Sequence, residues 1–94
     1  KHDPNQCVIP TVITPNNDGK NDNLRISCVE AGTFPENQLM IFNEWGDEVL
    51  DAAPYDNDWG GTYEGKPVPD GTYYYLFFRT PGSEPQKGFI TVFR

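Results

Sequence analysis

Short apolar runs separated by turn residues are the main pattern of this chain. Six segments are rich in β-branched and aromatic residues and have the length of short strands. They are residues 8–13, 23–29, 38–43, 47–50, 72–80 and 88–93. Gly and Pro number nine each, which argues against long helices. The pattern predicts an all-β fold: an antiparallel immunoglobulin-like β-sandwich of about seven short strands, with no helix beyond a single turn.

The strongest predicted strand is residues 72–80. Its side chains alternate between two faces, and both faces are apolar. One face holds Tyr73, Tyr75 and Phe77, and the other holds Tyr74, Leu76 and Phe78. A strand that is apolar on both faces is central in its sheet, or one of its faces is covered by something else. Two further strand-like segments, 39–42 and 48–50, flank a turn, and together they predict a hairpin.

The chain of 94 residues is the size of one domain, and its net charge is −7. Nucleic acid is not an expected partner, because phosphate binding needs clustered Lys and Arg. An anionic membrane surface is disfavoured for the same reason. No apolar run reaches the ~20 residues of a membrane-spanning helix. We expect residues 1–7 to be the end of a linker in a longer protein, and residues 8–94 to be the folded domain.

The two cysteines, Cys7 and Cys28, are candidates for a disulfide. Cys7 is in phase with Ile9 and Ile13, and Cys28 is in phase with Leu24 and Ile26, so both thiols are expected to face inward. An even cysteine count in a small acidic β domain favours a bridge and an oxidising compartment. The alternative is two buried free thiols in a cytosolic protein.

Residues 14–22 form a tract of side-chain oxygens around Gly19. Oxygens at alternating positions beside a glycine are typical of calcium loops. The candidate ligands are Thr14, Asn16, Asp18, the Lys20 carbonyl and Asp22. An EF-hand is excluded, because Arg25 stands where a bidentate glutamate would close the loop. The alternative is a turn in which Asn and Asp side chains bond their own backbone.

Catalytic chemistry is not expected. The only histidine is His2, in the presumed linker, so a rigid Ser-His-Asp or Cys-His arrangement is improbable. Two cysteines and one histidine cannot form a four-ligand zinc site.

The two tryptophans are open to two interpretations. Trp45 and Trp59 each precede a glycine in a turn. Both indoles either fold over the sandwich edge and fill the core, or form an aromatic surface for a carbohydrate or protein partner.

Five segments in order resemble one family. They are ITPNNDGKND (13–22), LMIFNEWG (39–46), Tyr55 with WGG (59–61), VPDGTYYY (68–75) and KGFITVFR (87–94). The chain resembles the gliding-motility-associated C-terminal domain of Bacteroidetes, the type B sorting domain of the type IX secretion system. It departs from the family pattern at Ile13, where phenylalanine is usual, and at Glu44, where arginine is usual.

The resemblance implies that the domain is an address on a large surface protein, often an adhesin. It would fold in the periplasm and dock on the translocon and on a small outer-membrane β-barrel partner, before the cargo reaches the cell surface. We expect a monomer that docks through the apolar excess of its last two strands. The expected contact residues are Trp45, Trp59, Asp70, Gly71, Tyr73, Tyr75, Lys87, Phe89 and Arg94. Polar substitutions at Tyr73, Tyr75 or Phe89 are expected to block export and leave folding intact.

Two other functions fit the same residues. One is an adhesion or carbohydrate-binding sandwich, with calcium holding the loops and Trp45 or Trp59 stacking on sugar. The other is a structural spacer in a stalk.

Overall fold

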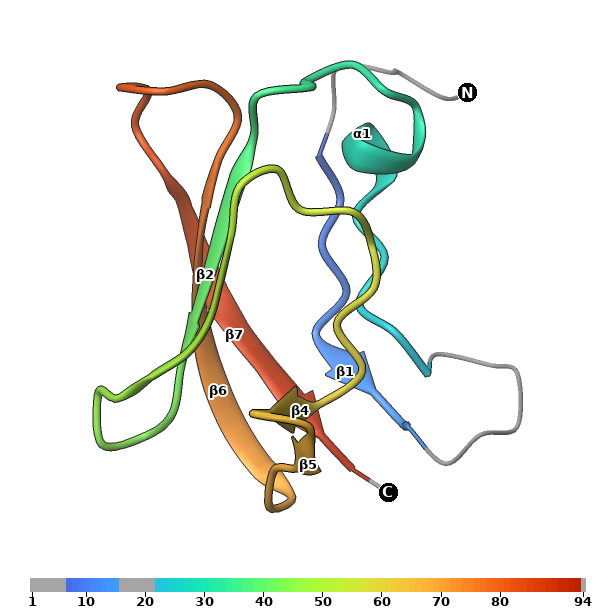
Figure 1. The fold of residues 1–94 in the computed structure, drawn as a ribbon, viewed down its shortest axis with the longest axis vertical. Coiled ribbons are helices and arrows are strands. Elements are labelled where there is room, and N and C mark those ends of the chain that lie inside the picture. Colours follow the sequence, from blue (N-terminus) through green and yellow to red (C-terminus); the bar gives the residue numbers. More distant parts are fainter. Residues whose placement is uncertain (1–6, 16–21, 94) are drawn as a thin grey trace.

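The computed structural model describes residues 7–15 and 22–93, and this part of the chain is all-β, as predicted. In chain order its elements are β1 (Val12–Ile13), α1 (Ser27–Glu30), β2 (Gln38–Phe42), β3 (Glu48–Ala52), β4 (Thr62–Tyr63), β5 (Lys66–Pro67), β6 (Gly71–Phe78) and β7 (Gln86–Val92). The one-turn helix α1 agrees with the expected upper limit on helix. Figure 1 shows the long strands on one side, and α1 with irregular segments on the other.

The main sheet has the order β1-β7-β6-β2-β3. β6 lies in its centre, as its two apolar faces predict, and pairs antiparallel with both β7 and β2. β2 and β3 form the expected hairpin, with a bulge between Ile41 and Phe42. The short β1 differs from the expectation, because it runs parallel to β7. The sheet is therefore mixed.

The second layer is irregular, and the predicted strand 23–29 is wrong. Its alternation in burial is present, since Leu24, Ile26 and Cys28 are all buried. However, the Ile26 N–H donates to the Asn57 side chain at 2.9 Å, and the chain then turns into α1. Side chains thus satisfy backbone groups that a strand ladder would otherwise pair.

Tyr55 joins the two segments of this layer. Its hydroxyl donates to the Leu24 carbonyl at 2.6 Å and accepts from the Trp59 N–H at 3.0 Å. Its own N–H donates at 2.8 Å to Asn37, a buried polar side chain. Residues 22–26 and 53–61 are therefore connected through a buried phenol as well as through the backbone bond from the Leu24 N–H to the Trp59 carbonyl.

The predicted strand 8–13 is regular only over β1. Pro10 lies within it and has no N–H to donate to a neighbouring strand. Val8 instead bonds Ser27: its N–H donates to the Ser27 hydroxyl at 2.9 Å, and its carbonyl accepts from the Ser27 N–H at 3.3 Å. The disulfide between Cys7 and Cys28 is present beside these bonds, as predicted. It ties the start of the described chain to α1.

A hairpin, β4 and β5, lies within a region that the sequence pattern leaves irregular. Its turn residues Glu64 and Gly65 both have positive φ, 53° and 81°. Such backbone twist matches a two-residue hairpin turn. The sequence signal for this hairpin is weak, because its turn is Glu-Gly and not the usual Asn-Gly or Asp-Gly.

The core lies between the sheet and the irregular layer. The sheet contributes Leu39, Ile41, Tyr73, Tyr75, Phe77, Ile90 and Val92, and the other layer contributes Leu24, Ile26, Tyr55, Trp59 and the disulfide. Within the described ranges, no helix has the length and apolarity needed to cross a membrane.

Candidate functional site

The outward side of the main sheet carries a row of three aromatic side chains. Phe42 of β2 lies opposite Tyr74 of β6, and Tyr74 lies opposite Phe89 of β7. Tyr74 is 50% exposed and Phe89 is 52% exposed. The Cβ atoms of directly opposite residues on neighbouring antiparallel strands lie about 4.5–5.5 Å apart. The row therefore forms an aromatic band across the sheet.

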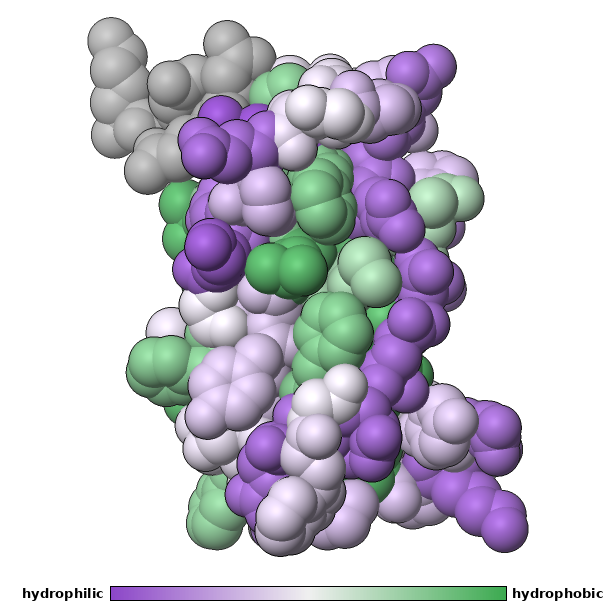
Figure 2. Space-filling view, turned by 90° about the vertical axis from the view of Figure 1, so that its left-hand side faces the viewer, coloured by the Kyte–Doolittle hydropathy of each residue, from purple (hydrophilic) through white to green (hydrophobic). Residues whose placement is uncertain are grey.

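Further apolar side chains extend this band along the strands. Met40 lies opposite Leu76, and Phe78 follows on β6 two residues after Leu76. We call the set the outer apolar face: Met40, Phe42, Tyr74, Leu76, Phe78 and Phe89. Figure 2 views the molecule from this side and shows apolar groups along its middle between polar margins. Lys87, opposite Leu76 and exposed, lies at one margin.

A hollow of about 400 Å³ lies on this face, beside the turn between β2 and β3. Phe42, Tyr74 and Leu76 contribute its apolar lining, and Glu44 and Lys87 contribute charged groups. Its size falls in the range of small-ligand sites, roughly 300–1,000 Å³. The outer apolar face is thus contoured and partly accessible.

The turn between β2 and β3 holds Trp45 away from the core. The Asn43 side-chain oxygen accepts from the backbone N–H groups of Trp45 and Asp47, each at 2.9 Å. Gly46 takes a φ of 85°, which glycine adopts without steric cost. Trp45 is consequently 80% exposed. The interpretation that both indoles fill the core is therefore wrong for Trp45.

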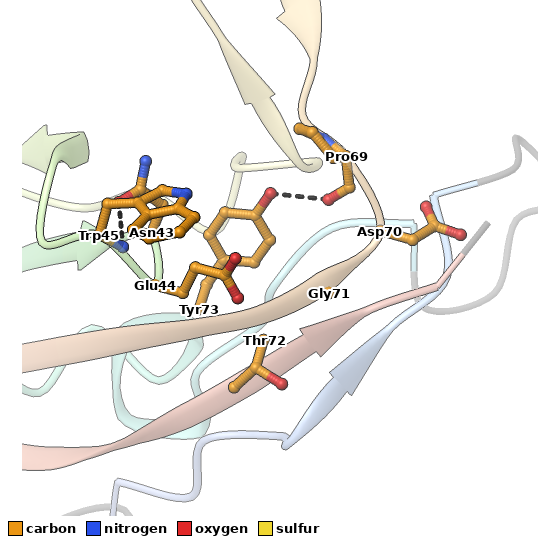
Figure 3. A pocket seen from close by; sticks show the side chains of 8 residues that line it. All are labelled: Asn43, Glu44, Trp45, Pro69, Asp70, Gly71, Thr72 and Tyr73. Atoms are coloured by element: carbon orange, nitrogen blue, oxygen red, sulfur yellow. Dashed lines mark hydrogen bonds between the residues drawn. The ribbon is translucent and has the colours of Figure 1, made fainter.

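A second, smaller hollow of about 140 Å³ lies beneath Trp45. Figure 3 shows its lining, which combines residues 43–45 with residues 69–73. The Tyr73 hydroxyl donates to the Pro69 carbonyl at 2.6 Å, which holds the turn before β6 against the ring. The structure thus brings Trp45, Asp70, Gly71 and Tyr73 together, although they come from two separate turns. We call this hollow the Trp45 pocket.

Three predicted contact residues have buried rings: Trp59, Tyr73 and Tyr75. The Trp59 indole N–H donates to the Thr62 carbonyl at 2.9 Å, and its ring meets Tyr73 edge-on at 6.4 Å between centroids. Burial also raises the pKa of the Tyr75 hydroxyl. The expectation that polar substitutions at Tyr73 and Tyr75 leave folding intact does not fit this position, because such changes would place polar groups in the core.

The remaining predicted residues lie at the surface or outside the described ranges. Lys87, Phe89, Asp70 and Gly71 are exposed. Arg94 lies outside the described residues.

Two residues of the outer apolar face, Met40 and Phe42, were not among the predicted contacts. A signal for them is present in the sequence, because they alternate along β2 with the inward-facing Leu39 and Ile41 and so form a second apolar face.

The proposed calcium loop is described only at its ends. Asn16, Asp18 and Lys20 lie outside the described residues, whereas Thr14 and Asp22 are half-buried at either side. In the ranges 7–15 and 22–93, no three or more His, Cys, Asp or Glu side chains are grouped so that they could hold a metal. The calcium loop stays a prediction.

Comparison with known proteins agrees with the resemblance in the motifs. A search of the curated proteins found no match. The family model of the CHU_C type IX secretion signal domain matches residues 7–92, which is nearly the whole chain. This match spans both layers of the sandwich, the disulfide and the outer apolar face. The chain therefore belongs to the CHU_C family of type IX secretion signal domains.

Proposed function

We propose that this domain is the C-terminal sorting signal of a large surface or secreted protein, and that it acts by docking its outer apolar face on the export machinery. A family of secretion signals implies export to the cell surface or the extracellular space, and it is not a family of enzymes. The observation that supports docking is the aromatic row Phe42, Tyr74 and Phe89. An apolar patch left exposed on a small domain marks an interaction site.

The composition of the face suits a protein partner. Aromatic residues and Met are enriched in the buried centres of protein interfaces, with polar residues at the rim. The outer apolar face has this arrangement, because Lys87 and Glu44 lie at the edge of its hollow. The partners we propose are the translocon and a small outer-membrane β-barrel protein, and the cargo we propose is an adhesin.

The proposed mechanism is recognition of a folded domain. The disulfide and the buried Tyr55 network stabilise the second layer, so that the sheet presents its other face in one geometry. The domain would fold in the periplasm, dock there, and leave the cell with its cargo. No covalent step is required of its residues.

Export of a fusion protein tests this function. Residues 1–94 are placed behind a signal peptide and a fluorescent cargo, in a bacterium that has this secretion system and the cognate membrane partner. We expect cargo in the medium and on the cell surface, and cargo retained in the periplasm of a translocon-deficient strain. Folded, intact cargo in the periplasm of both strains would contradict the proposal.

The exposed Trp45 favours one alternative, a carbohydrate-binding adhesion module. A solvent-exposed indole is able to stack on a sugar ring, whereas the buried Trp59 is not. Glycan-array binding by the isolated chain, lost on Trp45→Ala, would support this alternative. Absence of glycan binding together with translocon-dependent export would favour the sorting signal.

A further inference from the structure

We propose that the Trp45 pocket binds a basic side chain, Arg or Lys, of the protein on which this domain docks. This inference rests on the proposed docking function and adds the chemistry of one contact. The pocket lies next to the outer apolar face, because Asn43 and Glu44 line both hollows. A partner seated on that face would therefore bring its own side chains to the Trp45 pocket.

The size of the pocket limits what enters it. Its volume is about 140 Å³. This is well below the roughly 300 Å³ at which small-molecule sites begin. The pocket is therefore of a size to accept the end of one side chain.

The lining determines which side chain is favoured. It contains the carboxyl groups of Glu44 and Asp70, and it contains no Lys or Arg. Within the described parts of the chain, the exposed Glu44 carboxylate makes no hydrogen bond or ion pair. In Figure 3 this carboxylate lies on the same side of β6 as the Trp45 and Tyr73 rings, whereas Asp70 points away from them. Glu44 is therefore the main anionic group facing a ligand.

The Trp45 ring adds a second attraction for a cation. Tryptophan is the best aromatic partner for Arg or Lys, and the attraction acts when the cation lies over the ring face within about 6 Å of its centre. At 80% exposure most of the indole is accessible to such a group. The net charge of −7 also attracts a cationic partner during approach. An acidic side chain would be repelled by the same groups.

Nuclear magnetic resonance of the ¹⁵N-labelled 94-residue chain tests the pocket directly. The probe is the peptide acetyl-Gly-Arg-Gly-amide, and its matched control carries citrulline, a neutral analogue of arginine of nearly the same shape. We expect the arginine peptide to shift the Trp45 indole and Glu44 amide signals at millimolar concentration, and the citrulline peptide to leave them unchanged. Equal shifts with both peptides, or no shift with either at 50 mM, would overturn the inference.

Two variants locate the binding to named groups. Glu44→Gln and Trp45→Leu should each weaken binding of the arginine peptide by about two- to fivefold, as the loss of an exposed ion pair or cation–π contact does. The matched control is Glu84→Gln, since Glu84 is also exposed but lies in the loop at the opposite end of β6. It should bind the peptide as the unmodified chain does. Equal weakening by Glu44→Gln and Glu84→Gln, with no effect of Trp45→Leu, would attribute binding to net charge and overturn the inference.

Charge-reversal variants at the same two glutamates, tested in the export fusion, separate the two proposals. Glu44→Lys should lower export, whereas Glu84→Lys should not. If the unmodified fusion is exported and Glu44→Lys is exported equally well, the pocket has no role in docking and the inference falls while the sorting function stands. If the peptide binds with arginine specificity but the unmodified fusion is not exported, the sorting function falls and the chemistry of the pocket stands.

Discussion

Gly88 lies directly opposite Tyr75 across β7 and β6, and the Tyr75 ring occupies the space that a side chain at position 88 would fill. A Cβ atom built at Gly88 would lie 2.6 Å from the Tyr75 hydroxyl oxygen and 2.8 Å from the ring carbon that bears it. Glycine at this position is therefore what allows Tyr75 to lie flat against the inner face of the sheet. Gly88 thus serves the packing of the core, although its neighbour Phe89 belongs to the outer apolar face.

The substitution Gly88→Ala should destabilise the domain by about 1–3 kcal/mol, because it overpacks a buried contact. In an unobstructed strand, alanine would instead stabilise by about 0.5–1 kcal/mol relative to glycine. Urea unfolding followed by tryptophan fluorescence measures the difference. The double variant Gly88→Ala/Tyr75→Leu should lose less than the sum of the two single variants, since the clash is gone. Additive losses would show that the two residues do not compete for the same space.

Removal of the Tyr55 hydroxyl should destabilise the second layer. Tyr55→Phe leaves the buried Trp59 N–H and one acceptor site of the Leu24 carbonyl without their partner. An unsatisfied buried polar group costs about 1–3 kcal/mol, and we expect a loss in this range from urea unfolding. The control is Tyr74→Phe, at a half-exposed ring on the outer face, which should change stability by less than about 0.5 kcal/mol. Equal effects of the two variants would contradict a role for the Tyr55 network.

Stability should fall at alkaline pH. Burial raises the pKa of the Tyr55 hydroxyl above its usual value of 10.0, so the folded state keeps this group neutral. The unfolded chain begins to lose the same proton near pH 10. The contribution of Tyr55 is therefore complete below about pH 10, and it declines above that pH by up to about 1.4 kcal/mol per unit. Urea unfolding at pH 9, 10 and 11 measures the slope, which should be shallower in Tyr55→Phe. A stability that is flat up to pH 11 would exclude this linkage.

Loss of the Cys7–Cys28 disulfide should lower the free energy of unfolding by about 3 kcal/mol in the chain-entropy model. The bridge joins residues separated by 21 positions, and without it the unfolded chain gains freedom. Urea unfolding with and without a reductant measures the change. The double variant Cys7→Ser/Cys28→Ser is the control, because it should show the lower stability and no further response to reductant. Two alkylatable thiols in the unreduced protein would contradict the bridge.

Export should depend on aromatic residues of the outer apolar face and not on equally exposed aromatics elsewhere. The first matched pair is Tyr74→Ser against Tyr63→Ser, whose rings are 50% and 48% exposed. The second is Phe89→Ser against Phe93→Ser, at 52% and 63%. Truncation of a central hot-spot residue of an interface costs over 1 kcal/mol of binding, or more than about fivefold in affinity. We therefore expect Tyr74→Ser and Phe89→Ser to reduce secreted cargo, at melting temperatures similar to those of their controls. Equal export of all four variants would place the docking surface elsewhere.

Local sequence patterns were sufficient for strands β2, β6 and β7 of the main sheet, but not for the parallel pairing of β1. β2, β6 and β7 lie within about two residues of their predicted ranges, because alternation and flanking turn residues are encoded in neighbouring positions. The phase of Cys7 and Cys28 likewise predicted their inward direction. The irregular layer could not be predicted in this way. Its backbone groups bond the side chains of Tyr55 and Asn57, which lie 31 positions from their partners.

In the candidate site, too, some features follow from the local sequence and others only from tertiary packing. Trp45 and Trp59 have similar local sequences, each before a glycine, yet one indole is exposed and the other is buried. Trp59 belongs to the layer that packs on the sheet and meets Tyr73, whereas Trp45 lies at the tip of a hairpin. The alternation of β6 likewise determined that it has two apolar faces. Which face became the core and which stayed at the surface was decided only when the second layer packed against Tyr73, Tyr75 and Phe77, because burial is a property of the assembled layers and not of a single strand.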